Sequence, residues 1–160
     1  MAVFPLLKPS SSKLRVPALD PVSKRASSTT EMNAGAIRAG RVEIRQGSVS
    51  QLPYASGTFD LVTAVETIYF WPDLAADMRE VWRVVRPGGM IAIVCEVYKG
   101  AQTAMSVMVQ KCAPEYGMKM LSPEEHRNLL LGAGFNEVQV FTDEAEGWVC
   151  STGLKPLSAV

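Results

Sequence analysis

Several features that mark common classes of protein are absent from this chain of 160 residues. Its 16 Lys and Arg residues balance its 16 Asp and Glu residues, so the charge gives no sign of a nucleic-acid partner or an anionic membrane. No purely apolar run approaches the roughly 20 residues that span a bilayer. The three cysteines show no paired spacing and no signal peptide precedes them, which indicates a reducing compartment. We therefore expect a cytoplasmic protein without nucleic-acid or membrane partners.

Histidine is also scarce, since His126 is the only one. A metal site needs several ligands, and no cluster of Cys or carboxylate residues accompanies this histidine. The sequence therefore predicts no metal site. His126 follows a helix-capping motif on what the pattern indicates is a surface helix, and we expect no catalytic role for it.

The chain is long enough for one domain, and its apolar fraction of 48% is that of a globular protein. Residues 1–32 differ from the rest because they are rich in Pro, Ser and basic residues. Frequent prolines break helices and central strands, so this segment is predicted to be a disordered tail, with a folded domain at 33–156 and a short tail at 157–160. A Ser-rich, basic, acid-poor N-terminus is also typical of a transit peptide, which would place the protein in an organelle.

The clearest element is a helix that begins at Asp73, a residue type suited to capping a helix N-terminus. Apolar residues recur through it at helical spacing, and the Pro-Gly-Gly sequence at 87–89 ends it. Apolar strands of the buried type flank it at 59–65 and 90–97. A strand, a crossover helix and a second strand imply a parallel sheet with a right-handed connection. The apolar stripe of the helix, in which Trp82 is a core residue, consists of Leu74, Met78, Val81, Trp82 and Val85.

Weaker patterns lie on both sides of this unit. Residues 33–39 are predicted to end a helix at Gly40, and 41–46 alternate as a half-buried strand. A helix is expected over 101–112, with Met105 and Met108 on its apolar side.

The last third of the chain begins with a capping box at 122–125, which predicts a helix that Gly134 closes. Residues 135–142 and 147–152 alternate and are joined by a short acidic turn, which indicates an antiparallel hairpin at the edge of the sheet.

Three stretches of this chain, at 47–54, 59–66 and 79–89, together resemble the second half of a class I S-adenosylmethionine (SAM) dependent methyltransferase, of the type 11 methyltransferase domain. The resemblance covers about residues 33–156. It implies an α/β fold with a partial Rossmann-like sheet in which the family's strands 3, 4, 5, 6 and 7 are present. In that family the sheet order is 3-2-1-4-5-7-6, and strand 7 is antiparallel to the others.

Compared with the family, the chain lacks strand 1, its glycine-rich loop, and strand 2 with its terminal acidic residue, which implies an N-terminal truncation. Glycines in that loop allow close approach to the cofactor, and the acidic residue binds the ribose hydroxyls. No Gly-x-Gly follows a strand and opens a helix in this sequence. We expect either that strand 3 pairs directly with strand 4, or that the open edge of strand 4 binds a protein partner or a second copy.

The resemblance also implies a cofactor site for SAM. Gly47, Ser48 and Val49 match the segment that contacts the adenine edge, although a plain polar turn is the alternative. Val65, Glu66 and Thr67 match the end of strand 4 beside the methyl donor. Glu66 is a candidate catalytic residue that orients the substrate or acts as a base, and the alternative is a solvated loop charge.

An aromatic run follows that strand end. Tyr69 and Trp71 are candidates for a wall of the substrate site, and Tyr69 is also a candidate catalytic residue. The alternative is that these rings cap the core, which we expect of Phe70.

The resemblance therefore implies a SAM-dependent methyltransferase of a small-molecule acceptor. Two alternatives stay open. The chain is a degenerate, non-catalytic binding module or truncated isoform that pairs through its open sheet edge, or it is a fragment that does not fold alone.

Overall fold

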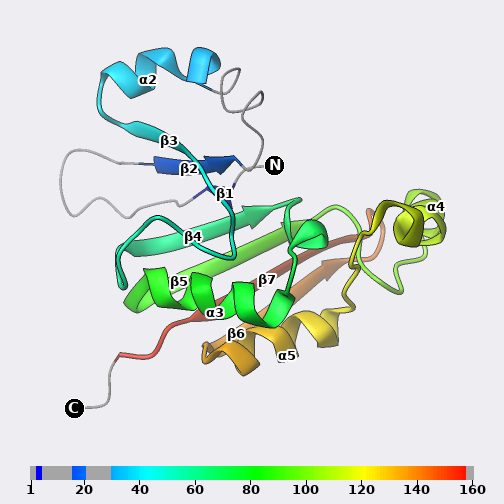
Figure 1. Ribbon diagram of the computed structural model, residues 1–160. Coiled ribbons are helices and arrows are strands. Elements are labelled where there is room, and N and C mark those ends of the chain that lie inside the picture. The colour runs from blue at the N-terminus through cyan, green and yellow to red at the C-terminus, as the bar shows by residue number, and fades with distance from the viewer. Residues whose placement is uncertain (1–2, 5–15, 21–29, 158–160) are drawn as a thin grey trace.

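The computed structural model describes residues 3–4, 16–20 and 30–157. Its centre is one seven-stranded sheet in the order β3-β2-β1-β4-β5-β7-β6 (Figure 1). The α/β class, the parallel pair β4–β5 and the antiparallel terminal hairpin are as the sequence predicted. Two strands, β1 and β2, add to the five that were expected, and four of the six strand pairings are antiparallel. The strands are β1 (Val3–Phe4), β2 (Val16–Asp20), β3 (Val42–Gln46), β4 (Phe59–Val65), β5 (Val85–Cys95), β6 (Asn136–Asp143) and β7 (Trp148–Leu154).

The unit β4-α3-β5 forms the middle of the sheet. Helix α3 (Leu74–Val84) begins as predicted, because the Asp73 side chain accepts hydrogen bonds from the backbone N–H groups of Ala75 and Ala76 at 3.0 Å. β4 and β5 are parallel, with Val62 opposite Ile91. The Pro-Gly-Gly turn does end the helix, but the structure includes it in β5, where Gly88 has a φ of +72°.

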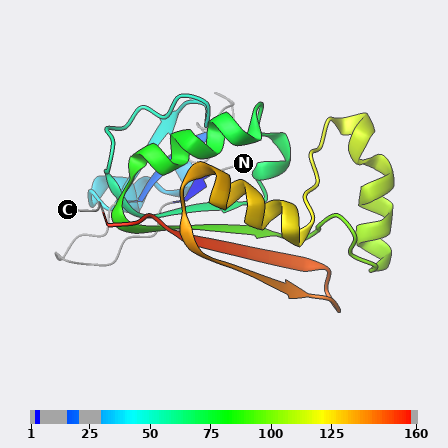
Figure 2. The ribbon, with the colours of Figure 1, turned by 90° about the horizontal axis from the view of Figure 1, so that it is seen from below.

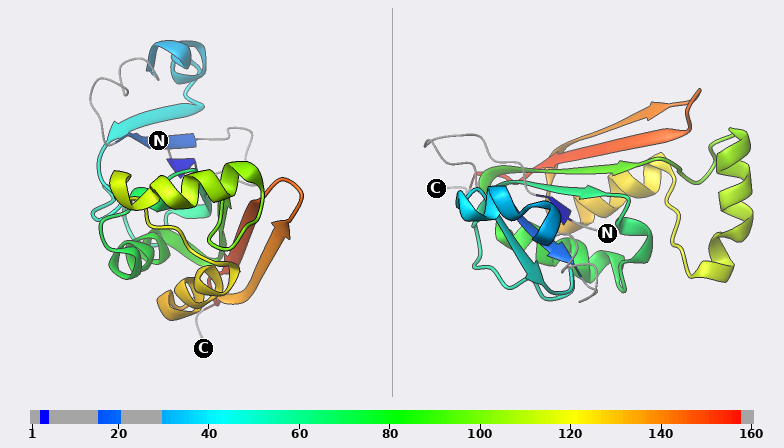
Figure 3. Two further views of the ribbon diagram at one scale, coloured as in Figure 1. Left: turned by 90° about the vertical axis from the view of Figure 1, so that its right-hand side faces the viewer. Right: turned by 90° about the horizontal axis from the view of Figure 1, so that it is seen from above.

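The C-terminal half of the fold follows the expected order. Helix α5 (Pro123–Ala133) has the predicted capping box, and Gly134 ends it with a φ of +101°. β7 pairs antiparallel with β5 and with β6, so the hairpin lies at the edge of the sheet. One further helix, α4 (Ala104–Cys112), stands beyond the carboxyl ends of β4 and β5 (Figures 1 and 3).

Within the predicted tail, residues 3–4 and 16–20 form strands, and residues 1–2, 5–15 and 21–29 lie outside the described residues. β2 pairs parallel with β3 over its whole length, and the two-residue β1 lies between β2 and β4. The expected bare edge of β4 is therefore paired, with Val3 opposite Ala64, and β3 does not pair directly with β4. β1 runs antiparallel to β4. The short helix α2 (Ala34–Arg38) precedes β3, and Gly40 ends it as expected.

Helices α3 and α5 pack on one face of the sheet and bury it (Figure 2). Two expectations fail here. His126, expected on a surface helix, is 1% exposed, and its Nδ1 lies 2.9 Å from the Oγ of Ser151. Met105 and Met108 of α4, expected on a buried side, are 60% and 55% exposed. α4 contacts mainly the adjacent 3₁₀ helix η2 (Ala113–Tyr116). Val109 packs against the core as expected of the apolar side, whereas Met105 and Met108 stay uncovered.

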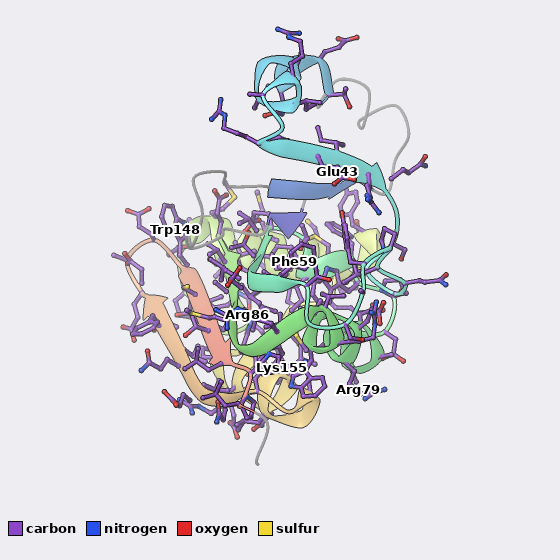
Figure 4. The ribbon with its side chains drawn as sticks, turned by 90° about the vertical axis from the view of Figure 1, so that its left-hand side faces the viewer. Glu43, Phe59, Arg79, Arg86, Trp148 and Lys155 are labelled. Atoms are coloured by element: carbon purple, nitrogen blue, oxygen red, sulfur yellow. The ribbon has the colours of Figure 1, made fainter. Side chains whose placement is uncertain are left out.

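Lys155, just after β7, closes the other end of α3 (Figure 4). Its ammonium group donates hydrogen bonds of 2.8 Å to the carbonyl oxygens of Trp82 and Val85, and lies 3.6 Å from the centre of the Trp82 ring. Trp82 is partly buried against the core, as its place on the helical stripe predicted. The lysine thus fixes the end of the chain to the helix that the core packs on.

Candidate functional site

The carboxyl ends of the parallel strands meet at one edge of the sheet, which is where ligands bind in open α/β sheets. β2 ends at Asp20, β3 at Gln46, β4 at Val65 and β5 at Cys95. Figure 1 shows the arrowheads of β4 and β5 pointing the same way, towards the segment that includes α4. The predicted site residues directly follow β3 or lie at and after the end of β4, so the fold brings both groups to this edge.

Glu66 is the most constrained of these residues. Its φ of +54° lies in the left-handed region, which costs a residue with a side chain about 1 kcal/mol or more. Its backbone N–H donates to the carbonyl of Val94 at 3.0 Å, and its carboxylate Oε1 accepts from the N–H of Glu96 at 2.5 Å. These bonds hold the carboxylate between the ends of β4 and β5. Burial raises the pKa of Glu66, and the bond from Glu96 N–H opposes part of that rise. The carboxylate is thus partly buried and hydrogen-bonded, a placement compatible with both interpretations made from the sequence.

Tyr69 lies beside Glu66 in the 3₁₀ helix η1 (Ile68–Phe70). Its hydroxyl donates to the carbonyl of Val97 at 2.8 Å and accepts from the N–H of Val97 at 3.2 Å. Burial, together with the nearby Cys95 and Glu66, raises the pKa of this hydroxyl. The group therefore stays protonated and is already hydrogen-bonded to the backbone. This arrangement suits Tyr69 to positioning the segment after β5.

The aromatic run does not divide as the sequence suggested. Tyr69 and Trp71, the candidates for a substrate wall, are 3% and 4% exposed, which fits the alternative of core packing. Phe70, expected in the core, is 53% exposed. These residues form a 3₁₀ turn and not a strand or an α-helix, and the turn decides which rings point inward. A run of three aromatic residues does not predict such a turn.

The segment Gly47–Val49 forms a turn after β3. The carbonyl oxygen of Ser48 accepts from the N–H of Gln51 at 3.1 Å, and its Oγ accepts from the N–H of Ser50 at 3.2 Å. Val49 is buried, whereas Ser48 is exposed. The turn thus leaves polar groups at the carboxyl end of β3, a placement compatible with both interpretations made from the sequence.

Asp20 is a site candidate that the sequence reasoning missed. It is the last residue of β2 and pairs with Gln46, the last residue of β3. This is the place of an acidic residue at the end of a second parallel strand, which the sequence analysis took to be absent. The signal was a short apolar run, Val16 to Leu19, that ends in an acid. Pro17 within it argued against a strand.

The described residues fit one half of a SAM molecule better than the other. An acid after β2 and a polar turn after β3 suit a ribose and an adenine. The methionine part needs a close backbone approach after a parallel strand 1, and two observations oppose one. β1 runs antiparallel to β4, so the chain leaves it at the opposite edge of the sheet, and no glycine precedes Gly35.

The described residues contain neither a cluster of metal ligands nor a membrane-spanning helix. No three of their His, Cys, Asp and Glu side chains lie together as metal ligands. None of their helices has the length and apolar character to cross a bilayer.

The model of one family, the methyltransferase domain, matches residues 4–93 of this chain. Among curated proteins, methyltransferase GfsG of Streptomyces halstedii is 32% identical over 108 residues, which is 66% of this chain and 38% of GfsG. The chloroplastic 2-methyl-6-phytyl-1,4-hydroquinone methyltransferase 1 of rice (Oryza sativa subsp. japonica) is 27% identical over 62% of this chain and 28% of its own length. The chain thus spans about a third of the length of these relatives.

Solved structures agree on the fold. A SAM-dependent methyltransferase from Thermotoga maritima superposes with a TM-score of 0.65 and 21% identity, over 86% of this chain and 72% of that one. At this level of identity the match concerns the fold alone.

Proposed function

Because the chain belongs to the methyltransferase family, we propose that it is a SAM-dependent methyltransferase that acts on a small-molecule acceptor. The observation that carries the proposal is the line of residues along one sheet edge, with Asp20 after β2, Gly47–Val49 after β3 and Glu66 after β4. The relatives support it, since both named above are methyltransferases. The rice enzyme's name specifies a small-molecule acceptor.

In this proposal the adenosine part of SAM lies across the ends of β2 and β3. Asp20 would accept hydrogen bonds from the ribose hydroxyls, and the turn at Gly47–Val49 would contact the adenine edge. When bound, SAM supplies a methyl group on a sulfonium, which is an electrophile. The contribution of the chain is then to hold the acceptor in line with that group and to exclude water.

Glu66 would act on the acceptor. Its backbone conformation and its bond from Glu96 N–H fix one carboxylate oxygen, which leaves the second, Oε2, for an acceptor hydroxyl or amine. A raised pKa makes a carboxylate a better base, so Oε2 would take the proton that the acceptor loses. Tyr69 would hold the segment after β5 in register with this group through its two bonds to Val97.

The acceptor would have an apolar part. Val65 and Phe70 lie on either side of Glu66 in sequence and are 40% and 53% exposed at the same edge of the sheet. Exposed apolar side chains beside a fixed carboxylate suit a molecule with a hydrocarbon body and one reactive polar group.

Affinity for SAM would be weak. The missing glycine loop removes two or three hydrogen bonds to a charged group, each worth about 1.5–3 kcal/mol. Such a loss lowers affinity by roughly a hundredfold to a millionfold. A micromolar site would become millimolar, and binding would depend strongly on Asp20.

Isothermal titration of the full chain with SAM tests this proposal. We expect binding in the millimolar range that Asp20→Asn weakens by about tenfold, the value of one hydrogen bond from a charged group. Glu124→Gln, at an exposed position on α5, is the matched control and should leave binding unchanged. Equal binding by wild type and Asp20→Asn would contradict the assignment of the ribose site.

A non-catalytic binding module is the second candidate, and the reversed β1 favours it. Methyl transfer from labelled SAM to a panel of hydroquinones and phenols separates the two. Transfer that Glu66→Gln lowers at least tenfold, with SAM affinity unchanged, supports the enzyme. An absence of transfer at saturating SAM supports the binding module.

A further inference from the structure

Over β5, β7 and β6, the face of the sheet opposite α3 and α5 carries no helix among the residues that the structure describes (Figures 2 and 3). Parallel strands are normally covered on both faces, because their side chains are apolar on both. β5 shows the resulting difference clearly. Ile91, Ile93 and Cys95 are fully buried under the helices, whereas Met90 and Val94, which point the other way, are only partly buried.

The neighbouring strands continue this surface. The register pairs Met90 with Leu154 and Val94 with Cys150 on β7, and Cys150 with Phe141 on β6. Phe141 is 56% exposed. We call this surface the open sheet face, and it consists of Met90, Ala92, Val94, Gln139, Phe141, Asp143, Trp148, Cys150, Thr152 and Leu154.

The face is hollowed at one end. A cavity of about 150 Å³ lies there, at the amino end of β5. The lining combines the apolar Met90 and Leu154 with polar side chains, among them the acidic Glu137. The lining residues are Met90, Glu137, Gln139, Thr152, Gly153 and Leu154.

The charges around the face are negative at both ends. Glu137 lies at the hollow, and Glu96, Glu144 and Glu146 are exposed at the other end, after β5 and in the turn between β6 and β7. β6 and β7 contain no Lys or Arg.

The basic residues that flank β5 and β7 in sequence form ion pairs or hydrogen bonds away from the open sheet face. Arg86 pairs with Asp60 at 2.6 Å, Lys99 pairs with Glu125 at 2.8 Å, and Lys155 bonds to the end of α3. An occupant of the face therefore meets an apolar centre and an acidic border.

The dimensions of the face select among occupants. Three strands spaced roughly 4.8 Å apart and six residues at roughly 3.3 Å each give a surface of about 14 by 20 Å. A helix is about 10 Å wide and rises 1.5 Å per residue, so one helix of about 13 residues covers it. Two copies packed face to face would bury well under the roughly 1,200 Å² that a stable dimer needs.

We propose that the open sheet face binds one amphipathic helix of a partner protein, with an apolar stripe that lies on Val94, Phe141 and Leu154 and with basic residues at its borders. A Lys or Arg of that helix places its apolar stem against Met90 and Leu154 in the hollow and its charge beside Glu137. The Val94 end of this site adjoins the carboxyl edge of the sheet, where Val94 pairs with Val65, but the proposed helix binding does not depend on the cofactor.

Synthetic peptides of about 14 residues test the proposal on the full chain. The first has leucines at helical spacing flanked by lysines, the second replaces every lysine with glutamate, and the third scrambles the leucines. Peptide anisotropy gives the affinity. Fluorescence of Trp148, which is 48% exposed and lies on the hairpin (Figure 4), reports contact with the face. We expect the first peptide to bind at micromolar concentration with a blue shift, and the other two to bind at least tenfold more weakly.

Matched variants locate the site. Phe141→Ser and Glu137→Lys should each weaken the basic peptide about tenfold, which is a loss of about 1.4 kcal/mol. Phe70→Ser, equally exposed but at the carboxyl edge, and Glu124→Lys on α5 should leave its affinity unchanged. Equal binding of basic and acidic peptides, or equal effects of the two phenylalanine variants, would overturn the proposal. So would a dimer in light scattering that Phe141→Ser dissociates, because a second copy would then occupy the face.

Discussion

Replacement of Lys155 by methionine removes the link between the end of β7 and the end of α3. The lysine is 8% exposed, and its ammonium group donates to the carbonyls of Trp82 and Val85. Without the lysine, both carbonyls lose their charged partner, and one of them belongs to the last turn of a helix. Methionine keeps most of the apolar stem, so the change isolates the charged group.

The magnitude follows from three contributions. Two hydrogen bonds from a charged donor contribute about 1.5–3 kcal/mol each, and the contact with the Trp82 ring contributes about 0.5–2 kcal/mol. Burial of the ammonium group opposes them, and it lowers the pKa of Lys155. We therefore expect Lys155→Met to lower the free energy of unfolding by about 3 kcal/mol, just below the lower end of that sum because burial of the charge opposes it.

Urea denaturation followed by circular dichroism measures this change, and a thermal melt should show a loss of about 6–12 °C for a domain of this size. Lys111→Met is the matched control, because Lys111 is exposed on α4, and its change should stay below about 0.5 kcal/mol. A loss for Lys155→Met that equals the control would refute the claim that these bonds hold α3 to the end of the chain.

Two further predictions concern α5. Burial lowers the pKa of His126 to about 4, so the unfolded state takes up the proton first. Stability should fall by about 3 kcal/mol as the pH drops from about 6.5 to about 4, and His126→Gln should lose that part of the pH dependence in denaturation curves. If the free energy of unfolding falls equally with pH in the wild type and in His126→Gln, the burial of His126 is contradicted. Gly134→Ala should destabilise by about 1–3 kcal/mol, because its φ is +101° and a Cβ would lie 3.2 Å from the Trp82 indole nitrogen. Gly132→Ala, in the helix with open space around it, should stabilise by about 0.5–1 kcal/mol. If chemical denaturation shows that both glycine variants change the free energy of unfolding in the same direction, the argument is contradicted.

Strong local patterns predicted the central elements. The strand at 59–65 has the bounds of β4, and the Asp73 cap and the capping box at 122–125 both form. Each of these signals is local, since a cap depends on residues three or four apart and a buried strand on its own composition.

The errors came where distant contacts decide the structure. β2 contains Pro17 and reads as a tail, yet pairing with β3 makes it a strand and brings Asp20 to the sheet edge. His126 looked like a surface residue because nothing in its helix indicates Ser151, which is 25 positions away. The left-handed conformation of Glu66 was also invisible, because it depends on bonds to β5.

The measurement that tests the central claim most directly is an amide NMR titration of the chain with S-adenosylhomocysteine, the methyl-free product. The account predicts the largest shifts at the carboxyl edge, in the amides of Asp20, Gly47, Ser48 and Glu66, with little change in the open sheet face. Shifts that are absent at millimolar ligand, or that centre on β6 and β7, would contradict a cofactor site at the ends of β2, β3 and β4.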